Sequence, residues 1–265
     1  MEVDEAFSKI SVIIPCFNSQ NTVNRALNSV CSQITKPYEL IVIDDASTDN
    51  TLDLLNNFAQ KKHDFKVTVI RNSLNIGPGL SRNLGWDISS GEWVAFLDAD
   101  DSWLENKIEM QIEYTRKLKS VDVLSFKSTR YGSKADKTIL DTGKIRKLKF
   151  NNLIFRNQVI TRTTSARKSL SYRFPRGLSE DFSLWLECLS GGLNVYKVDK
   201  VVAFTYRRDY SKGGLSSQLF QHELFEIKRL GDYTTKSPVL VTFAILFSVS
   251  KFIRRVLISL SRNFY

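Results

Sequence analysis

The sequence contains few cysteines and histidines and no long apolar run. Its three cysteines, Cys16, Cys31 and Cys188, are too sparse and irregularly spaced for a disulfide framework or a zinc site, so we expect reduced thiols. Residues 1–5 are acidic and lack the apolar segment of a secretory signal. No apolar segment reaches the roughly 20 residues that a membrane-spanning helix needs. Together these absences predict a cytoplasmic protein.

Acidic residues are scarce in the second half of the chain. The formal net charge is +10, and only Asp136 and Asp141 are acidic between residues 127 and 176. No acid follows residue 233. This excess of positive charge favours an anionic partner such as a phosphorylated substrate, an anionic lipid or nucleic acid. We do not expect nucleic acid, because the sequence has no zinc-finger spacing, aromatic RNA-binding signature or helix-turn-helix pattern.

Strand and helix patterns alternate through the first half of the chain. Apolar runs predict strands, and amphipathic segments between them predict helices, which is typical of an α/β protein with parallel βαβ units. We expect strands at residues 10–15, 39–43, 66–70, 93–97 and 121–126, and helices at 22–31, 50–60, 80–88 and 103–118. Ligands of such sheets bind beyond the carboxyl ends of the strands, where three of these runs are followed by polar residues.

The pattern is weaker after residue 127. We expect a loop or hairpin over residues 127–146, a mobile loop over 208–217, helices at 182–189 and 218–230, and strands at 193–198 and 201–206. The C-terminus combines an apolar stretch, residues 239–247, with a basic amphipathic one, residues 251–258. This combination favours a segment that lies in a membrane interface, and the alternative is a final helix packed on the core.

Three carboxylates follow the fourth predicted strand. Asp98, Asp100 and Asp101 would repel one another unless a cation neutralised them. Mg²⁺ and Mn²⁺ take oxygen ligands and commonly bridge to phosphates, so a metal–diphosphate site is one interpretation. The other is an acidic turn that caps the following helix.

Five motifs together resemble those of family 2 glycosyltransferases with the GT-A fold, in the order of that family. They occupy residues 11–18, 44–51, 75–85, 98–100 and 179–181. The resemblance covers roughly residues 10–215. It implies a GT-A domain over residues 1–235, in which a Rossmann-like nucleotide-binding βαβ sheet (about 8–125) is continuous with an acceptor-binding half (about 126–235). Residues 236–265 would add C-terminal amphipathic helices at the membrane interface.

The resemblance implies an inverting transferase that uses a nucleotide-diphosphate sugar and Mn²⁺ or Mg²⁺. Asp100 would ligate the metal together with Asp98, and Asp98 would also contact the ribose or sugar hydroxyls. Asp101 would ligate as well or cap the next helix, and we favour the cap. The residues implied in donor-nucleotide binding are Pro15, Phe17, Asn18, Asp44, Asp45, Arg82, Asp98 and Arg207.

Several of these donor residues have alternative interpretations. Phe17 packs near the nucleotide or belongs to the core. Asp45 matches the residue that contacts uracil in the family, and Asp44 does the same or braces the turn. Arg82 meets the diphosphate or nucleotide, unless it is a surface or helix-dipole charge.

Inversion requires one base on the face opposite the leaving group. Asp181 matches the family's base, and Glu180 is the second candidate. The predicted helix that begins beside them would favour the ionised form of Asp181. The alternative is a pair of helix N-terminal acids without a chemical role.

Short members of the family that carry a C-terminal segment like residues 236–265 are similar to bacterial O-antigen or capsular glucosyltransferases. This similarity implies transfer of a single hexose, first glucose from UDP-glucose and second galactose, in a β linkage to a sugar on undecaprenyl diphosphate. The chain lacks the Gln-x-x-Arg-Trp motif of processive members. We expect a peripheral enzyme on the inner face of the cytoplasmic membrane. The alternatives are a transferase for lipooligosaccharide core and an inactive sugar-nucleotide-binding scaffold.

Overall fold

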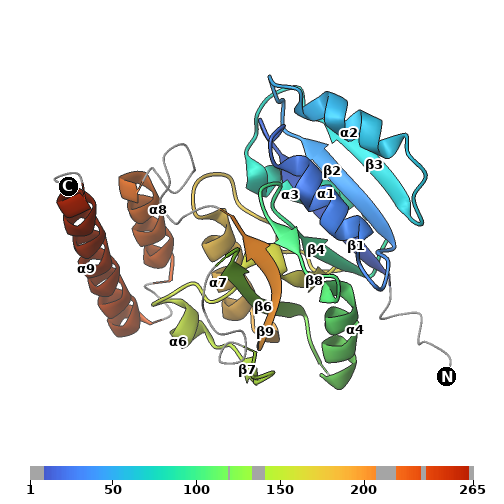
Figure 1. Cartoon of the computed structure of the whole chain (residues 1–265). Coiled ribbons are helices and arrows are strands. Elements are labelled where there is room, and N and C mark those ends of the chain that lie inside the picture. Colours follow the sequence, from blue (N-terminus) through green and yellow to red (C-terminus); the bar gives the residue numbers. More distant parts are fainter. Residues whose placement is uncertain (1–8, 119, 133–140, 207–218, 234–236, 263–265) are drawn as a thin grey trace.

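A nine-stranded mixed sheet forms the centre of the molecule (Figure 1). The computed structural model describes the chain apart from residues 1–8, 119, 133–140, 207–218, 234–236 and 263–265. The strand order is β3-β2-β1-β4-β8-β6-β9-β5, and β7 pairs with β9. The sheet is continuous from the predicted donor half into the predicted acceptor half.

The first four strands are parallel, as the alternating pattern predicts. β1, β2 and β4 are buried along their whole length because helices cover both faces of this part of the sheet. Their bounds, with that of the edge strand β3, are β1 (Ile10–Cys16), β2 (Glu39–Asp44), β3 (Lys66–Arg71) and β4 (Trp93–Phe96). The helices of this half are α1 (Val23–Cys31), α2 (Thr51–Ala59), α3 (Pro78–Ile88) and α4 (Lys107–Lys117).

Two glycines place α3 against the sheet. Gly77 has a φ of 90°, a conformation that favours glycine, and it turns the chain into the helix. A Cβ atom on Gly85 would lie only 2.6 Å from Cγ2 of Ile13 on β1. The glycine therefore allows α3 to lie directly on β1 and brings its first turn to the edge where β1 and β4 end.

Three expectations for the strands were wrong or incomplete. The helix predicted from residue 103 begins at Lys107, and β5 (Ser102–Trp103) pairs with β9 instead. The two strands expected over residues 193–206 form one strand, β9 (Val195–Thr205). Its pairing with β6 is irregular between Lys197 and Val201, where Asp199 N–H bonds to the carbonyl of Lys144. β8 (Ser165–Arg167) was not predicted, since three residues carry too little pattern.

The second half of the chain adds strands that continue the sheet beyond β4, together with the helices that pack beside them. Besides β8 and β9, these are β6 (Val123–Arg130), β7 (Ile145–Lys147), α6 (Phe150–Leu153), η2 (Thr161–Thr163) and α7 (Glu180–Ser190). Aromatic side chains fasten α7 to the donor half. The ring of Phe174 packs edge-on against Phe96 of β4 at 5.3 Å and against Trp185 of α7 at 5.7 Å. This cluster fixes the N-terminus of α7 near the end of β4.

Two antiparallel C-terminal helices, α8 (Leu219–Gly231) and α9 (Pro238–Arg262), lie far from α2 and β3 (Figure 1). The apolar and basic segments expected as two helices form the single helix α9. Val241 and Ala244 are buried against the rest of the protein, whereas Phe243 is 62% and Leu246 61% exposed. Among the described residues, no helix combines the length and apolar character needed to cross a membrane. Part of α9 thus packs on the core while its other face stays apolar and exposed.

Candidate active site

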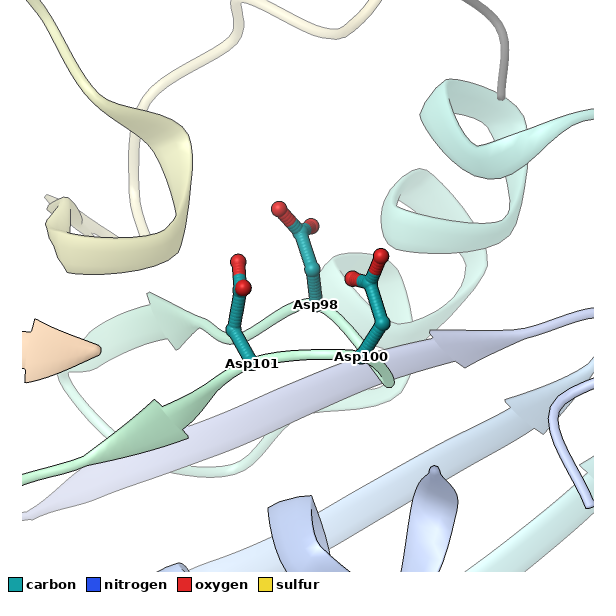
Figure 2. Close-up of side chains that lie close together, drawn as sticks. All are labelled: Asp98, Asp100 and Asp101. Carbon is teal, nitrogen blue, oxygen red and sulfur yellow. The ribbon is translucent and has the colours of Figure 1, made fainter. Parts of the chain in front are cut away.

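Three carboxylates converge in the loop after β4 (Figure 2). Asp98, Asp100 and Asp101 each place one carboxylate oxygen within 4.8 Å of the others, and the three side chains point to the same side of the loop. Asp98 and Asp100 are half-buried, and Asp101 is 2% exposed. Hard divalent cations bind such sets of oxygen ligands, so the residues fit a Mg²⁺ or Mn²⁺ site.

Asp101 does not cap a helix, which corrects the preferred sequence interpretation. α4 begins six residues later, and the Asp101 carboxylate instead pairs with Nε of Arg162. Burial raises the pKa of Asp101 to about 7, although Arg162 opposes the shift. Asp98 Oδ2 lies 3.7 Å from the same Nε atom. Asp101 therefore holds a guanidinium beside the other two carboxylates.

Arg162 was missed by the sequence analysis. It lies in η2, and its backbone carbonyl accepts a 2.7 Å hydrogen bond from Nε1 of Trp103. It belongs to none of the five motifs, and it meets Asp101 across 61 positions of sequence. Only the basic character of residues 127–176 gave a general signal of cations in this half.

Arg82 joins the two acidic motifs. Its Nη2 atom lies 2.6 Å from Oδ1 of Asp98, and its Nη1 atom lies 3.2 Å from Oε1 of Glu180. The residue is only 6% exposed, so it is not a surface charge. Burial disfavours the ionised form of Asp98, but Arg82 and Arg162 outweigh it and lower the pKa of Asp98. The Nε atom of Arg82 has no hydrogen-bond partner among the described residues, and a contact of Arg82 with a diphosphate stays a prediction.

Asp181 lies at the start of α7 with both carboxylate oxygens engaged. Oδ1 accepts a 2.7 Å hydrogen bond from the N–H of Phe182, and Oδ2 accepts one of 3.0 Å from Nδ2 of Asn157. Burial raises the pKa of Asp181 and also that of Glu180. The expected net effect of the helix N-terminus, a preference for the ionised form, is therefore outweighed by burial. A carboxylate with a raised pKa suits a general base at neutral pH.

Asp44 and Asp45 have different environments. Asp45 braces the turn before α3, because its oxygens accept hydrogen bonds from the N–H groups of Ile76 (3.0 Å) and Gly77 (2.8 Å). Asp44 is fully buried at the end of β2, and neither of its oxygens has a hydrogen-bond partner among the described residues. Arg71 Nε lies 3.6 Å from one of them. Asp45 therefore braces the turn, and Asp44 is buried beside Arg71. The contact of either acid with uracil stays a prediction.

The remaining donor candidates lie at the end of β1. Pro15 is buried within the strand, which continues to Cys16. Phe17 is 48% exposed, so the alternative that it belongs to the core is wrong. Asn18 has a φ of 45°, and its Oδ1 accepts a 2.9 Å hydrogen bond from the N–H of Thr48 in the loop after β2. Arg207 and the expected mobile loop at 208–217 lie outside the described residues.

Comparisons with known proteins show the family of this chain. The family described as Glycosyl transferase family 2 matches residues 11–171. Two similar proteins of Escherichia coli, WfaP and WfgD, are named UDP-Glc:alpha-D-GlcNAc-diphosphoundecaprenol beta-1,3-glucosyltransferases. WfaP is 32% identical over 80% of this chain and 81% of its own length. WfgD is 30% identical over 84% of this chain and 86% of its own length.

Solved structures support the fold. The S. aureus TarS fragment 1–349, solved in complex with UDP-GlcNAc, matches with a TM-score of 0.65 and 24% identity. The match covers 84% of this chain and 66% of that longer chain. A mannosyltransferase from Pyrobaculum calidifontis, solved with GDP-Man and Mn²⁺, has a TM-score of 0.63 at 14% identity and covers 97% of this chain and 81% of its own. The chain thus has the GT-A fold, belongs to glycosyltransferase family 2 and is a glycosyltransferase.

Proposed function

We propose that this enzyme transfers one glucose from UDP-glucose, with inversion, to a sugar carried on undecaprenyl diphosphate during surface polysaccharide synthesis. The observation that carries the proposal is the bridge made by Arg82, which brings the carboxylates after β4 next to the acids of α7. A site for the leaving diphosphate and a base for the acceptor hydroxyl thereby share one region. The substrate names rest on the similarity to WfaP and WfgD.

The donor nucleotide would bind beyond β1 and β2. Asp45, or Asp44 beside it, would accept the N–H of a uracil ring, as the resemblance to the family implies. A ring that reaches Asp44 would have to uncover the buried oxygens of that residue, which lie beside Arg71. The exposed ring of Phe17 offers a surface on which the base can stack. Pro15 and Asn18 shape the adjoining loop, Asp45 holds the turn before α3, and Arg207 is proposed to contact the diphosphate.

Asp98 and Asp100 would hold Mn²⁺ or Mg²⁺ against the donor diphosphate. When bound, the ion offsets the negative charge that develops on the departing UDP. Arg162 pairs with Asp101, and Asp98 is itself paired with Arg82, so Asp98 would exchange part of this pairing for the ion. Asp98 would also contact hydroxyl groups of the donor.

We assign the base to Asp181, with Glu180 as the second candidate. Asp181 takes the proton of the acceptor hydroxyl as that oxygen bonds to the anomeric carbon. The bond from this carbon to the diphosphate oxygen breaks on the opposite face, so an α-linked donor gives a β-linked product. Glu180 is less suited because its Oε1 atom is paired with the charged Arg82. Asp181, in contrast, accepts hydrogen bonds from the neutral donors of Phe182 and Asn157.

The exposed apolar face of α9 is proposed to hold the enzyme at the inner face of the cytoplasmic membrane. Phe243 and Leu246 lie on this face, and the sequence beyond it contains Lys251, Arg254 and Arg255 but no acid. Apolar burial and attraction to anionic lipids then act together. Residues 236–265 are thus proposed as a membrane-contact segment, which also packs through Val241 and Ala244 on the catalytic domain proposed over residues 1–235.

A transfer assay tests the proposed function. The enzyme is incubated with UDP-glucose, Mn²⁺ and α-GlcNAc linked through diphosphate to a short alkyl chain, and the product is analysed by mass and linkage. We expect one added β-linked glucose. Addition of galactose from UDP-galactose alone would replace the donor assignment, and no product from either donor would favour an inactive scaffold or another acceptor such as lipooligosaccharide core.

A further inference from the structure

A group of basic side chains lies outside the motifs, around β6, β7 and β9. We call it the basic cluster and define it as Lys127, Arg146, Arg156 and Lys197. Nη2 of Arg146 lies 2.8 Å from Oδ1 of Asp199, and Nζ of Lys127 lies 3.4 Å from the same oxygen. Two cations thus share a single carboxylate oxygen, which leaves excess positive charge at this position.

Lys197 increases this excess because it is buried beside the others. It is 8% exposed, and its Nζ donates a 2.6 Å hydrogen bond to the carbonyl of Gln158. Burial and the positive charges of Arg146, Lys127 and Arg156 lower the pKa of Lys197 to about 8, and only Asp199 opposes them. Crowded like charges raise the free energy of the folded protein unless an anion offsets them.

The basic cluster lies close to the proposed base along the chain. Gln158, which binds Lys197, directly follows Asn157, which binds Asp181. Chain geometry therefore limits the distance from Lys197 Nζ to the Asp181 carboxylate to at most about 15 Å. A diphosphate one sugar away from a hydroxyl held at Asp181 can therefore fall within reach of the basic cluster.

We propose that the basic cluster binds the diphosphate that links the acceptor sugar to its lipid. The inference rests on the proposed function and names the part of the chain that recognises its acceptor. Arg146 is 40% exposed at its side chain and Lys127 22%, so both can meet a ligand. Guanidinium and ammonium groups are the side chains suited to diphosphate oxygens. The donor diphosphate is proposed to bind at Asp98 and Asp100, so the enzyme would hold two diphosphates on opposite sides of the reacting carbon.

Two acceptors distinguish this role from a general structural one. The first is α-GlcNAc linked through diphosphate to a short alkyl chain, and the second is the same sugar linked to that chain without phosphate. For Arg146→Gln and Lys127→Gln we expect the KM of the diphosphate acceptor to rise about tenfold or more, because each loses a charge-assisted contact. The KM of UDP-glucose and the rate with the phosphate-free acceptor should stay unchanged.

Lys147→Gln is the matched control, because it removes an exposed positive charge from the same strand as Arg146 without touching Asp199. Arg146→Lys, which keeps the charge, should recover much of the affinity. If wild-type enzyme does not use the phosphate-free acceptor, the test is whether Arg146→Gln and Lys127→Gln raise the KM of the diphosphate acceptor more than the KM of UDP-glucose. Equal effects on both substrates, or none, would overturn the inference while wild-type transfer still supports the proposed function. Absence of wild-type transfer would instead overturn the proposed function.

Discussion

Nδ2 of Asn157 donates a 3.0 Å hydrogen bond to Oδ2 of Asp181. The orientation of this amide is fixed, because its Oδ1 atom accepts a 3.1 Å hydrogen bond from the N–H of Val159. The other oxygen of Asp181 is held by the N–H of Phe182. Asn157 therefore sets the position of the proposed base and supports its ionised form, although it does not touch the reacting atoms.

Replacement of Asn157 by alanine should change the pH dependence of transfer. The hydrogen bond favours the carboxylate, so its loss raises the pKa of Asp181 further above its usual range, in the direction that burial already imposes. Only the ionised base is active, and the acidic limb of kcat/KM should therefore move to higher pH. Near neutral pH we expect a loss of about tenfold.

The control is Asn152→Ala, which removes an exposed amide side chain from α6. The charged groups around Asp181 are Glu180, Arg82, Asp98 and Arg162, and the substitution leaves all of them in place. A lower rate with an unmoved pH profile would show that Asn157 acts only through folding or acceptor binding.

The substitution Asp100→Asn should remove the increase in UDP affinity that the metal ion provides. With Mn²⁺ present, calorimetry should give an affinity at least about tenfold below that of the wild type, because one charged ligand of the ion is lost. Wild-type protein in EDTA should bind UDP as weakly as the variant. Asp53→Asn, an exposed carboxylate on α2, serves as control. If EDTA leaves the affinity of the wild-type protein for UDP unchanged, the proposed metal site is contradicted.

The paired substitution Phe243→Glu and Leu246→Glu should release the protein from vesicles of anionic phospholipid in a sedimentation assay. Both side chains are about 60% exposed, so the change places charge where apolar contact is proposed and leaves the packed face of α9 intact. Transfer to a short-chain acceptor should persist. Truncation at residue 236 is less informative, because it also removes the buried Val241 and Ala244. Phe243→Leu is the control, and unchanged sedimentation of the double variant would count against this surface.

Much of the donor half could be predicted from the sequence, whereas the links between the two halves could not. β1 and β2 are rich in Val and Ile, and Gly77 with Pro78 marks the start of α3. Such signals are local, so they can be read without the fold. The contacts of Arg162 with Asp101 and of Asn157 with Asp181 join distant segments, and neither residue has a pattern around it.

The roles of Asp44 and Asp45 show the same limit at close range. Two adjacent carboxylates after a strand are equivalent in sequence, and only the folded turn decides which one meets the N–H groups of Ile76 and Gly77. Burial at the start of α7 likewise outweighs the helix N-terminus, and this balance depends on side chains packed from elsewhere.

The most direct test of the account compares turnover and UDP binding in Asp181→Asn. The substitution keeps the shape of the side chain and removes the base. We predict that transfer from UDP-glucose to the diphosphate-linked acceptor falls by about a thousandfold or more, whereas UDP affinity in Mn²⁺ stays within about twofold of the wild type. Turnover close to the wild-type rate would contradict Asp181 as the base and with it the proposed mechanism.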